Sequence, residues 1–238
     1  MEITWHGGDL REGASARILY SGNIEFLRRY LTRIIFYAAA EPTLQLHFHV
    51  VAAENEASEF IREANVLAET IQGFSRRSSE LPALSWSSSH LPAGVGNPIT
   101  YYACARYLVA QQVMDRFEAD VWIQDVDLYP VSPIADSYTK FKEFDVVLAA
   151  STGIDRLAPW RRYLAGNVFL ARSDKGRQFA ARTADYVMAF LDQPNSWMLD
   201  QNALDWAVET AQPGTIIGNI NALNIGLTQS VMNGAIES

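Results

Sequence analysis

Short apolar runs alternate with amphipathic stretches along most of the chain, from Ile18 onward. The runs predict strands and the stretches predict helices, and their alternation is typical of an α/β protein with a mostly parallel central sheet flanked by helices. The predicted strands cover residues 17–20, 44–53, 83–86, 121–124, 145–150 and 167–171. The predicted helices cover residues 24–38, 57–72, 98–118, 175–191 and 197–210.

The chain shows no internal repeat and no linker that would divide it. We therefore expect a single domain over residues 1–238. Residues 211–236 carry no charge and are rich in Asn, Gly and Ile. This end of the chain, 211–238, is expected to be either a final strand and meander or a loosely packed tail.

The composition excludes several classes of protein. The chain is 49% hydrophobic and 19% charged, which excludes disorder and a coiled coil. Its net charge of −8 argues against nucleic acid or an anionic membrane as the main partner. The longest apolar run, Ile34 to Ala40, is too short for a transmembrane segment, and no secretory signal is recognisable. With Cys104 as its one cysteine, the protein is expected to be soluble and cytoplasmic.

Two carboxylates, Asp125 and Asp127, directly follow the apolar strand predicted at 121–124. Their spacing puts both on the same side of an extended backbone, where two like charges are unfavourable unless a cation joins them. Ligands of open α/β sheets bind beyond the carboxyl ends of the strands, and hard oxygen ligands suit Mg²⁺ or Mn²⁺. The pair therefore favours a metal site, and the alternative is that Asp127 caps the turn before Pro130 while Asp125 is solvated.

An arginine lies on the core-facing stripe of the preceding helix. Arg106 shares one face with Tyr102, Val109 and Val113. Burying a guanidinium is costly unless it meets an anion, so we expect Arg106 to reach Asp125 or a diphosphate. The alternative is that Arg106 lies at the margin of the stripe and extends to water.

Three further features have competing interpretations. Since His47 and His49 alternate with apolar residues on one strand, they predict a solvated face, with a metal pair as the alternative. The stretch 94–98 predicts a helix start capped by Asn97, although its glycines also suit a phosphate cradle. Cys104 is expected to be a small buried residue.

The order of four segments resembles the donor-binding core of GT-A glycosyltransferases, most similarly the retaining, family-eight-like branch. The resemblance spans about Ile18 to Val208, most of the chain. The segments are Tyr20-Ser21-Gly22-Asn23 with Phe26-Leu27, then Ile99-Thr100-Tyr101-Tyr102-Ala103-Cys104-Ala105-Arg106, then Asp120-Val121-Trp122-Ile123-Gln124-Asp125-Val126-Asp127, and finally Trp197-Met198-Leu199-Asp200-Gln201-Asn202-Ala203-Leu204.

The resemblance implies a metal-dependent transferase that uses a nucleotide-diphosphate sugar. Tyr20 and Ser21 would then hold the nucleotide, Asp125 and Asp127 a Mn²⁺ or Mg²⁺ ion, and Arg106 would neutralise phosphate charge or fix the Asp pair. Asp200, as the catalytic candidate, would hydrogen-bond sugar hydroxyls or orient the acceptor. Asn167 and Gln201 are candidate contacts of the sugar or acceptor, a glycan, lipid or protein.

Trp160 is a further candidate acceptor contact, because its ring could stack on a sugar; it could equally anchor its loop to the core.

Two departures from the family pattern leave other functions open. The family's Asn-before-Gly motif is reversed here as Gly166-Asn167, and no late histidine supplies a third metal ligand, since the last histidine is His90. One alternative is a haloacid-dehalogenase-like phosphatase with Asp125 as nucleophile, although that family normally carries its motif near the N-terminus. The other is a GT-A module that binds a nucleotide or glycan without turnover.

Overall fold

The computed structural model describes residues 1–8, 16–40, 44–74, 83–128, 134–193 and 197–223. Over these residues the chain forms strands β1 (Thr4–Trp5), β2 (Ala16–Asn23), β3 (Gln45–Val51), β4 (Ala83–Ser89), β5 (Asp120–Gln124), β6 (Val146–Ala150), β7 (Tyr163–Leu170) and β8 (Ile217–Asn219). The α-helices are α1 (Ile24–Ala40), α2 (Glu54–Phe74), α3 (Pro98–Phe117), α4 (Ile134–Phe141), α5 (Pro159–Arg162), α6 (Asp174–Phe190) and α7 (Leu199–Glu209). Two short 3₁₀ helices, η1 (Gly153–Leu157) and η2 (Ile220–Leu223), complete the elements.

The described strands form one sheet in the order β1-β4-β3-β2-β5-β7-β6-β8. Strands β4, β3, β2 and β5 run parallel to one another, and β8 runs parallel to β6. Strand β7 is antiparallel to both of its neighbours, and β1 is antiparallel to β4. The structure confirms the predicted α/β class with a mostly parallel sheet, and it adds the antiparallel insertion at β7.

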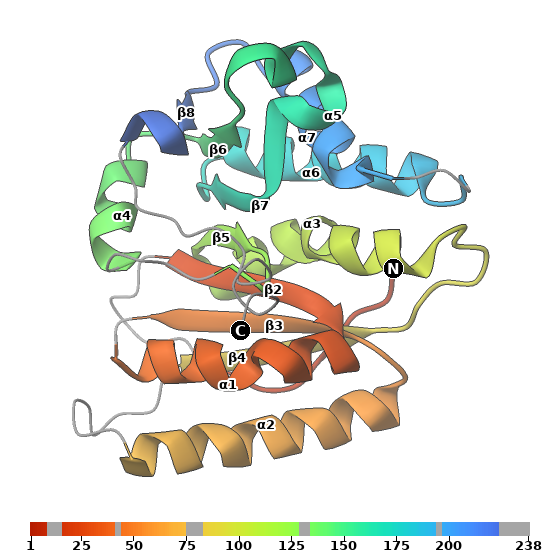
Figure 1. The fold of residues 1–238 in the computed structure, drawn as a ribbon, viewed down its shortest axis with the longest axis vertical. Coiled ribbons are helices and arrows are strands. Elements are labelled where there is room, and N and C mark those ends of the chain that lie inside the picture. The colour runs from red at the N-terminus through yellow and green to blue at the C-terminus, as the bar shows by residue number, and fades with distance from the viewer. Residues whose placement is uncertain (9–15, 41–43, 75–82, 129–133, 194–196, 224–238) are drawn as a thin grey trace, which may run out of the picture.

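Helices cover both faces of this sheet (Figure 1). On one face α1, α2 and α4 bury apolar side chains such as Leu27, Phe60 and Phe141 against the sheet. On the other face α3 packs through Val109 and Val113, and α6 and α7 pack beside it. Helices α1 and α3 bury apolar stripes that the sequence pattern predicts, and this burial is the main source of their stability in the fold.

The candidate site lies at one edge of the sheet, where several strands and helices begin or end. The parallel strands β2 and β5 end there, and α3 begins there (right side of Figure 1). The side chain of Asn97 accepts a hydrogen bond from the backbone N–H of Ile99, and Pro98 occupies the first turn. The predicted capped start of α3 is therefore confirmed. Because β7 is antiparallel to β5, its first residues, beginning at Tyr163, also lie at this edge.

The prediction of a solvated face for His47 and His49 is wrong. Both side chains are fully buried between the sheet and α3. Each imidazole is hydrogen-bonded at both nitrogens to serines of β4: His47 to Ser85 and Ser87, and His49 to Ser87 and Ser89, at 2.8–3.0 Å. The face is polar as predicted, but a second row of polar side chains satisfies it instead of water.

The uncharged end of the chain contributes a short strand, β8, and the 3₁₀ helix η2. The rest of the predicted tail, 224–238, lies outside the described residues. Within the described part of the chain, no helix combines the length and apolar character needed to cross a membrane.

Candidate functional site

A cavity of about 410 Å³ opens at the edge where β2 and β5 end and α3 begins. Its polar groups include two carboxylates, Asp125 and Asp127, and one guanidinium, Arg106. Three elements distant in sequence supply these groups and the apolar rim beside them. The described lining residues are Ser21, Gly22, Asn23, Phe26, Ile99, Tyr102, Ala103, Arg106, Asp125 and Asp127; we call this hollow the DxD cavity.

Arg106 is the central cation of the site. Its side chain is 6% exposed, and its Nη1 lies 2.5 Å from Asp125 Oδ1 while its Nη2 lies 3.1 Å from Asp200 Oδ2. The Nη2 also donates to the backbone oxygen of Ala165 at 3.3 Å. Burial alone would lower the pKa of Arg106, but the facing carboxylate of Asp125 raises it above the ordinary value. The alternative of an arginine that extends to water is therefore excluded.

The carboxylate of Asp125 is held against the backbone of β7. The N–H of Asp125 donates to the oxygen of Gly166 at 2.8 Å. A Cβ at position 166 would lie 2.3 Å from Asp125 Oδ2 and 3.0 Å from its Cγ. Only glycine leaves room here for a carboxylate that Arg106 already fixes.

Asp127 faces the same cavity from the loop after β5. Burial and the neighbouring charge of Asp125 raise the pKa of Asp127 above its usual range. A cation placed between the two carboxylates would relieve both effects. The described residues contain no group of three or more His, Cys, Asp or Glu side chains that could hold a metal ion. Two carboxylates are nevertheless the protein ligands that Mg²⁺ commonly uses when substrate phosphates and water supply the rest.

Asp200 approaches the site from the first turn of α7. Its side chain is 14% exposed, and the backbone N–H of Gln201 donates to its Oδ1 at 2.9 Å. Burial raises the pKa of Asp200, although Arg106 opposes the shift. The preceding Met198 adopts a left-handed conformation with φ of 59°, which turns the chain into α7. Arg106 therefore joins Asp125, which follows β5, to Asp200, which lies in α7.

The predicted site residues divide into two groups in the structure. Ser21, Arg106, Asp125 and Asp127 line the DxD cavity, and Asp200 joins them through Arg106, with Gln201 directly after it. The other three lie elsewhere: Tyr20 and Asn167 in the interior, and Trp160 on the surface at α5.

The two interior residues have structural partners. Tyr20 stacks on Phe48, and its hydroxyl donates to Gln124 Oε1 at 2.8 Å. Asn167 accepts a hydrogen bond from the indole Nε1 of Trp122 at 2.5 Å. Both contacts tie β5 to its neighbours in the sheet, directly beneath the strand end that carries Asp125.

Sequence reasoning did not identify the apolar rim of the site. Phe26 and Ile99 line the DxD cavity, and Ile99 is 73% exposed although it is large and apolar. A second cavity of about 430 Å³ shares Asn23 and Tyr102 with the first and extends over the ends of β3 and β4 to His90. No local sequence signal marks Ile99, because a single apolar residue in the first turn of a helix can be exposed or buried.

A larger hollow lies elsewhere, in a groove of about 710 Å³ between α1 and α2. Its lining mixes glutamates and arginines, several of them exposed at the surface, among them the paired Arg28 and Glu63. We assign the site to the smaller cavity because its central charged side chain, Arg106, is buried and paired with carboxylates, whereas Arg28 and Glu63 of the groove are exposed.

No protein-family model matches the sequence, and no curated protein matches it either. Solved structures do share the fold. The glycosyltransferase GlyE from Streptococcus pneumoniae TIGR4 is 13% identical, with a TM-score of 0.52 over 87% of this chain and 46% of GlyE. The galactosyltransferase LgtC is 12% identical, with a TM-score of 0.51 over 86% of this chain and 73% of LgtC. The bifunctional glycosyltransferase WbbM is 11% identical, with a TM-score of 0.50 over 87% of this chain and 39% of WbbM.

This chain therefore spans less than half the length of GlyE and of WbbM. At identities of 11–13% the likeness establishes the fold and not the activity. Within that limit it agrees with the order of motifs along the sequence: the chain has the GT-A fold of glycosyltransferases.

Proposed function

We propose that this protein is a glycosyltransferase that moves a sugar from a nucleotide-diphosphate sugar to an acceptor. One observation carries the proposal: Asp125, Asp127 and the buried Arg106 converge in one cavity at the carboxyl edge of the sheet. Open α/β sheets bind their ligands at this edge. The cavity and its neighbour over β3 and β4 share Asn23 and Tyr102, and two adjoining hollows suit a ligand as long as a nucleotide joined to a diphosphate.

Asp125 and Asp127 are the residues that would hold a Mg²⁺ or Mn²⁺ ion. Their hard oxygen donors and their mutual repulsion both suit a divalent cation shared with a diphosphate. When bound, such an ion stabilises the charge that develops on a diphosphate leaving group.

The chain's own residues would bind and orient the donor. Ser21 and Tyr102 lie in the cavity wall where hydroxyl groups can meet a ribose or a base. Arg106 keeps Asp125 in one orientation and supplies positive charge behind the carboxylates. Asp200, held by the same arginine, would accept a hydrogen bond from a hydroxyl of the transferred sugar.

The proposal is tested by donor binding. Thermal unfolding would be followed with nucleotide-diphosphate sugars of different bases, with and without Mn²⁺ or Mg²⁺, in the wild type and in Asp127→Asn. A ligand at 100 times its Kd stabilises the folded state by about 2.7 kcal/mol, which a melting curve resolves. We expect one base to give a metal-dependent shift that Asp127→Asn abolishes. The matched control Asp185→Asn, at an exposed position on α6, should retain the shift.

Turnover separates the proposal from its alternatives. Slow hydrolysis of the bound donor in the absence of acceptor would support a transferase, whereas tight binding without any turnover would identify a non-catalytic module. The phosphatase alternative needs Asp125 as a free nucleophile, but its Oδ1 is paired with Arg106, which lowers its nucleophilicity. No shift with any nucleotide sugar would overturn the proposal.

A further inference from the structure

A second polar hollow lies at the same edge of the sheet, outside the site described above. It has a volume of about 550 Å³ and is lined by Ala150, Gly153, Arg156, Leu157, Arg162 and Tyr163. We call it the β7 cavity, because Tyr163 begins that strand. Its lining contains two arginines and a tyrosine hydroxyl but no carboxylate, in a chain whose net charge is −8.

Arg162 is held in place from behind. Its Nη1 lies 2.8 Å from Asp205 Oδ1 and 3.1 Å from Glu209 Oε1, both on α7, and its Nε donates to the backbone oxygen of Arg156 at 3.0 Å. These contacts occupy two of its three nitrogens. The remaining Nη2 contacts no hydrogen-bond acceptor among the described residues. A guanidinium fixed in this way is preorganised to donate to a further anion.

Arg156 contributes a positive charge that no described carboxylate compensates. Its guanidinium forms no ion pair or hydrogen bond with the described residues, whereas Arg161 on the same segment pairs with Asp155. Tyr163 lies within its electrostatic reach, and burial raises the pKa of this hydroxyl so that it stays a protonated donor at neutral pH. The β7 cavity therefore presents one cation without a described counter-charge, Arg156, together with the Nη2 donor of the paired Arg162 and the hydroxyl donor of Tyr163.

Strand β7 connects this cavity to the DxD cavity. Tyr163 lines the one, while Ala165 accepts from Arg106 and Gly166 accepts from the N–H of Asp125 at the other. Gly166 lies three residue steps of extended chain after Tyr163, a distance of about 10 Å. The two cavities are thus neighbours along one strand.

Large exposed apolar side chains belong to η1 and α5, the elements that supply Arg156, Leu157 and Arg162 to the β7 cavity. Ile154 and Leu157 of η1 are 81% and 79% exposed, and Trp160 of α5 is 49% exposed. An exposed indole beside guanidinium groups is typical of surfaces that bind sugars or amphipathic ligands rather than bulk water.

We infer that the β7 cavity binds an anionic group, a phosphate or a carboxylate, and that the acceptor of the transfer carries this group. The two arginines and Tyr163 would bind the anion, while Trp160 and Leu157 would contact the uncharged part of the same molecule. The role as acceptor site rests on the proposed function; the binding of an anion does not.

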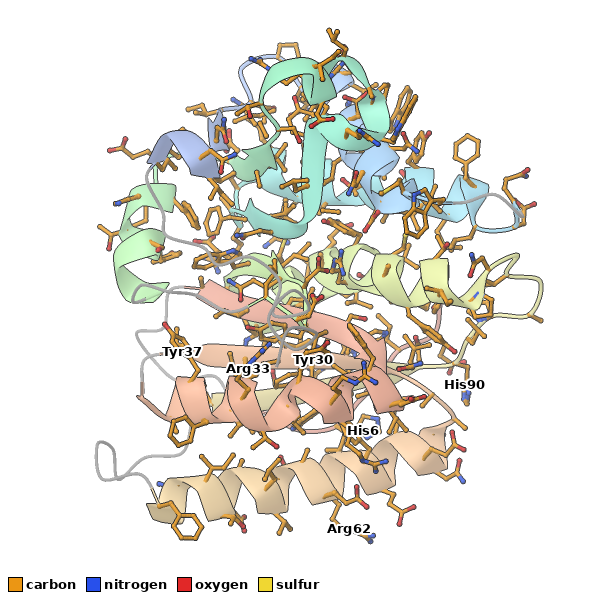
Figure 2. The ribbon with its side chains drawn as sticks, viewed as in Figure 1. His6, Tyr30, Arg33, Tyr37, Arg62 and His90 are labelled. Atoms are coloured by element: carbon orange, nitrogen blue, oxygen red, sulfur yellow. The ribbon has the colours of Figure 1, made fainter. Side chains whose placement is uncertain are left out.

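The test is calorimetric titration of the nucleotide-free protein, at constant ionic strength, with inorganic phosphate, with glucuronate and with neutral glucose. We expect at least one anion to bind and glucose to bind far more weakly. Arg156→Gln should weaken the anion about tenfold, the effect of one lost charge-assisted hydrogen bond, and Arg156→Lys should retain part of the affinity. Arg62→Gln, on the outer surface of α2, is the matched control and should leave the affinity unchanged (Figure 2).

The relative affinities of phosphate and glucuronate distinguish a phosphorylated acceptor from one that contains an acidic sugar. Equal binding in the wild type and in Arg156→Gln would overturn the inference, since the anion would then lie elsewhere, for example beside Arg106. Failure of both anions to bind would overturn it as well. Donor binding is measured separately with nucleotide sugars. If no nucleotide sugar bound, the role of the β7 cavity as an acceptor site would be withdrawn, but the Arg156-dependent anion site would remain.

Discussion

Arg106 stabilises two carboxylates at once, which makes it the most consequential single residue of the site. We predict that Arg106→Met destabilises the protein by about 3 kcal/mol at pH 7, the lower end of the range for breaking a buried ion pair, because Asp125 is partly exposed. Urea unfolding of the metal-free protein measures the change. Arg62→Met is the control: Arg62 pairs with Glu59 at 3.6 Å on the surface of α2, so its loss should cost no more than about 0.5 kcal/mol. Equal effects of the two substitutions would contradict the central role of Arg106.

Gly166 is predicted to be essential for donor binding although it carries no side chain. In Gly166→Ala the new Cβ would overlap Asp125 Oδ2, so the carboxylate must leave its place beside Arg106. We expect metal-dependent nucleotide binding to weaken about tenfold or more, because a misplaced ligand forfeits much of the benefit of preorganisation. Gly73→Ala, near the end of α2, is the control: its Cβ would meet nothing within 4 Å, so nucleotide binding should stay unchanged.

The sequence was sufficient to predict the charged residues of the candidate site, but not the residues of neighbouring strands that pack against them. Asp125 and Asp127 follow an apolar strand and Arg106 lies on an apolar stripe, and both are local patterns. Gly166 matters only because β7 runs antiparallel beside β5, a pairing that depends on the whole sheet. The interior place of Tyr20 has the same origin, because its partner Gln124 is on the neighbouring strand.

At the scale of elements, strands β3 and β4 are joined by side chains as well as by backbone. His47 and His49 alternate with Ser85, Ser87 and Ser89 across the pair, and Arg17 donates to Ser85 at 2.6 Å from β2. Histidines alternate with apolar residues in the sequence of β3, and in β4 serines alternate with Leu84 and Trp86 before the run Ser87–Ser89. The burial of these polar side chains could not be predicted. The sequence of one strand looks the same whether water or a polar neighbour supplies the hydrogen bonds.

This arrangement predicts how stability depends on pH. Burial lowers the pKa of His49 from 6.5 to about 3, so the folded state keeps it neutral while the unfolded chain can protonate it. The contribution of neutral His49 to the free energy of unfolding is complete above pH 6.5. It is lost as the pH falls toward 3, and the loss is about 2 kcal/mol at pH 5. The free energy of unfolding, measured with urea between pH 7 and pH 4, should therefore decrease less steeply in His49→Gln than in the wild type. His90→Gln should keep the wild-type slope, because His90 is exposed (Figure 2).

At the scale of the whole molecule, the α/β class followed from the alternation of apolar runs and amphipathic stretches, and the structure confirms it. The route between β6 and β7 did not follow from that pattern. Elements η1 and α5 are too short to show a helical period, and they return the chain so that β7 enters antiparallel between β5 and β6. This insertion places the β7 cavity and the DxD cavity on one strand, so the arrangement of candidate sites is a property of the sheet.

The continuous sheet also predicts how the molecule unfolds. The described strands form one sheet from β1 to β8, and α3 packs both on that sheet and on α6 and α7, so neither half buries its core alone. We expect urea unfolding to show a single transition, with far-UV circular dichroism coincident with the fluorescence of the buried Trp86 and Trp122, although chains above about 150 residues often unfold in steps. A bound donor should move this whole transition to higher urea. Separate transitions for the two probes would show that the chain has two independently folding parts, and would contradict the single domain predicted here.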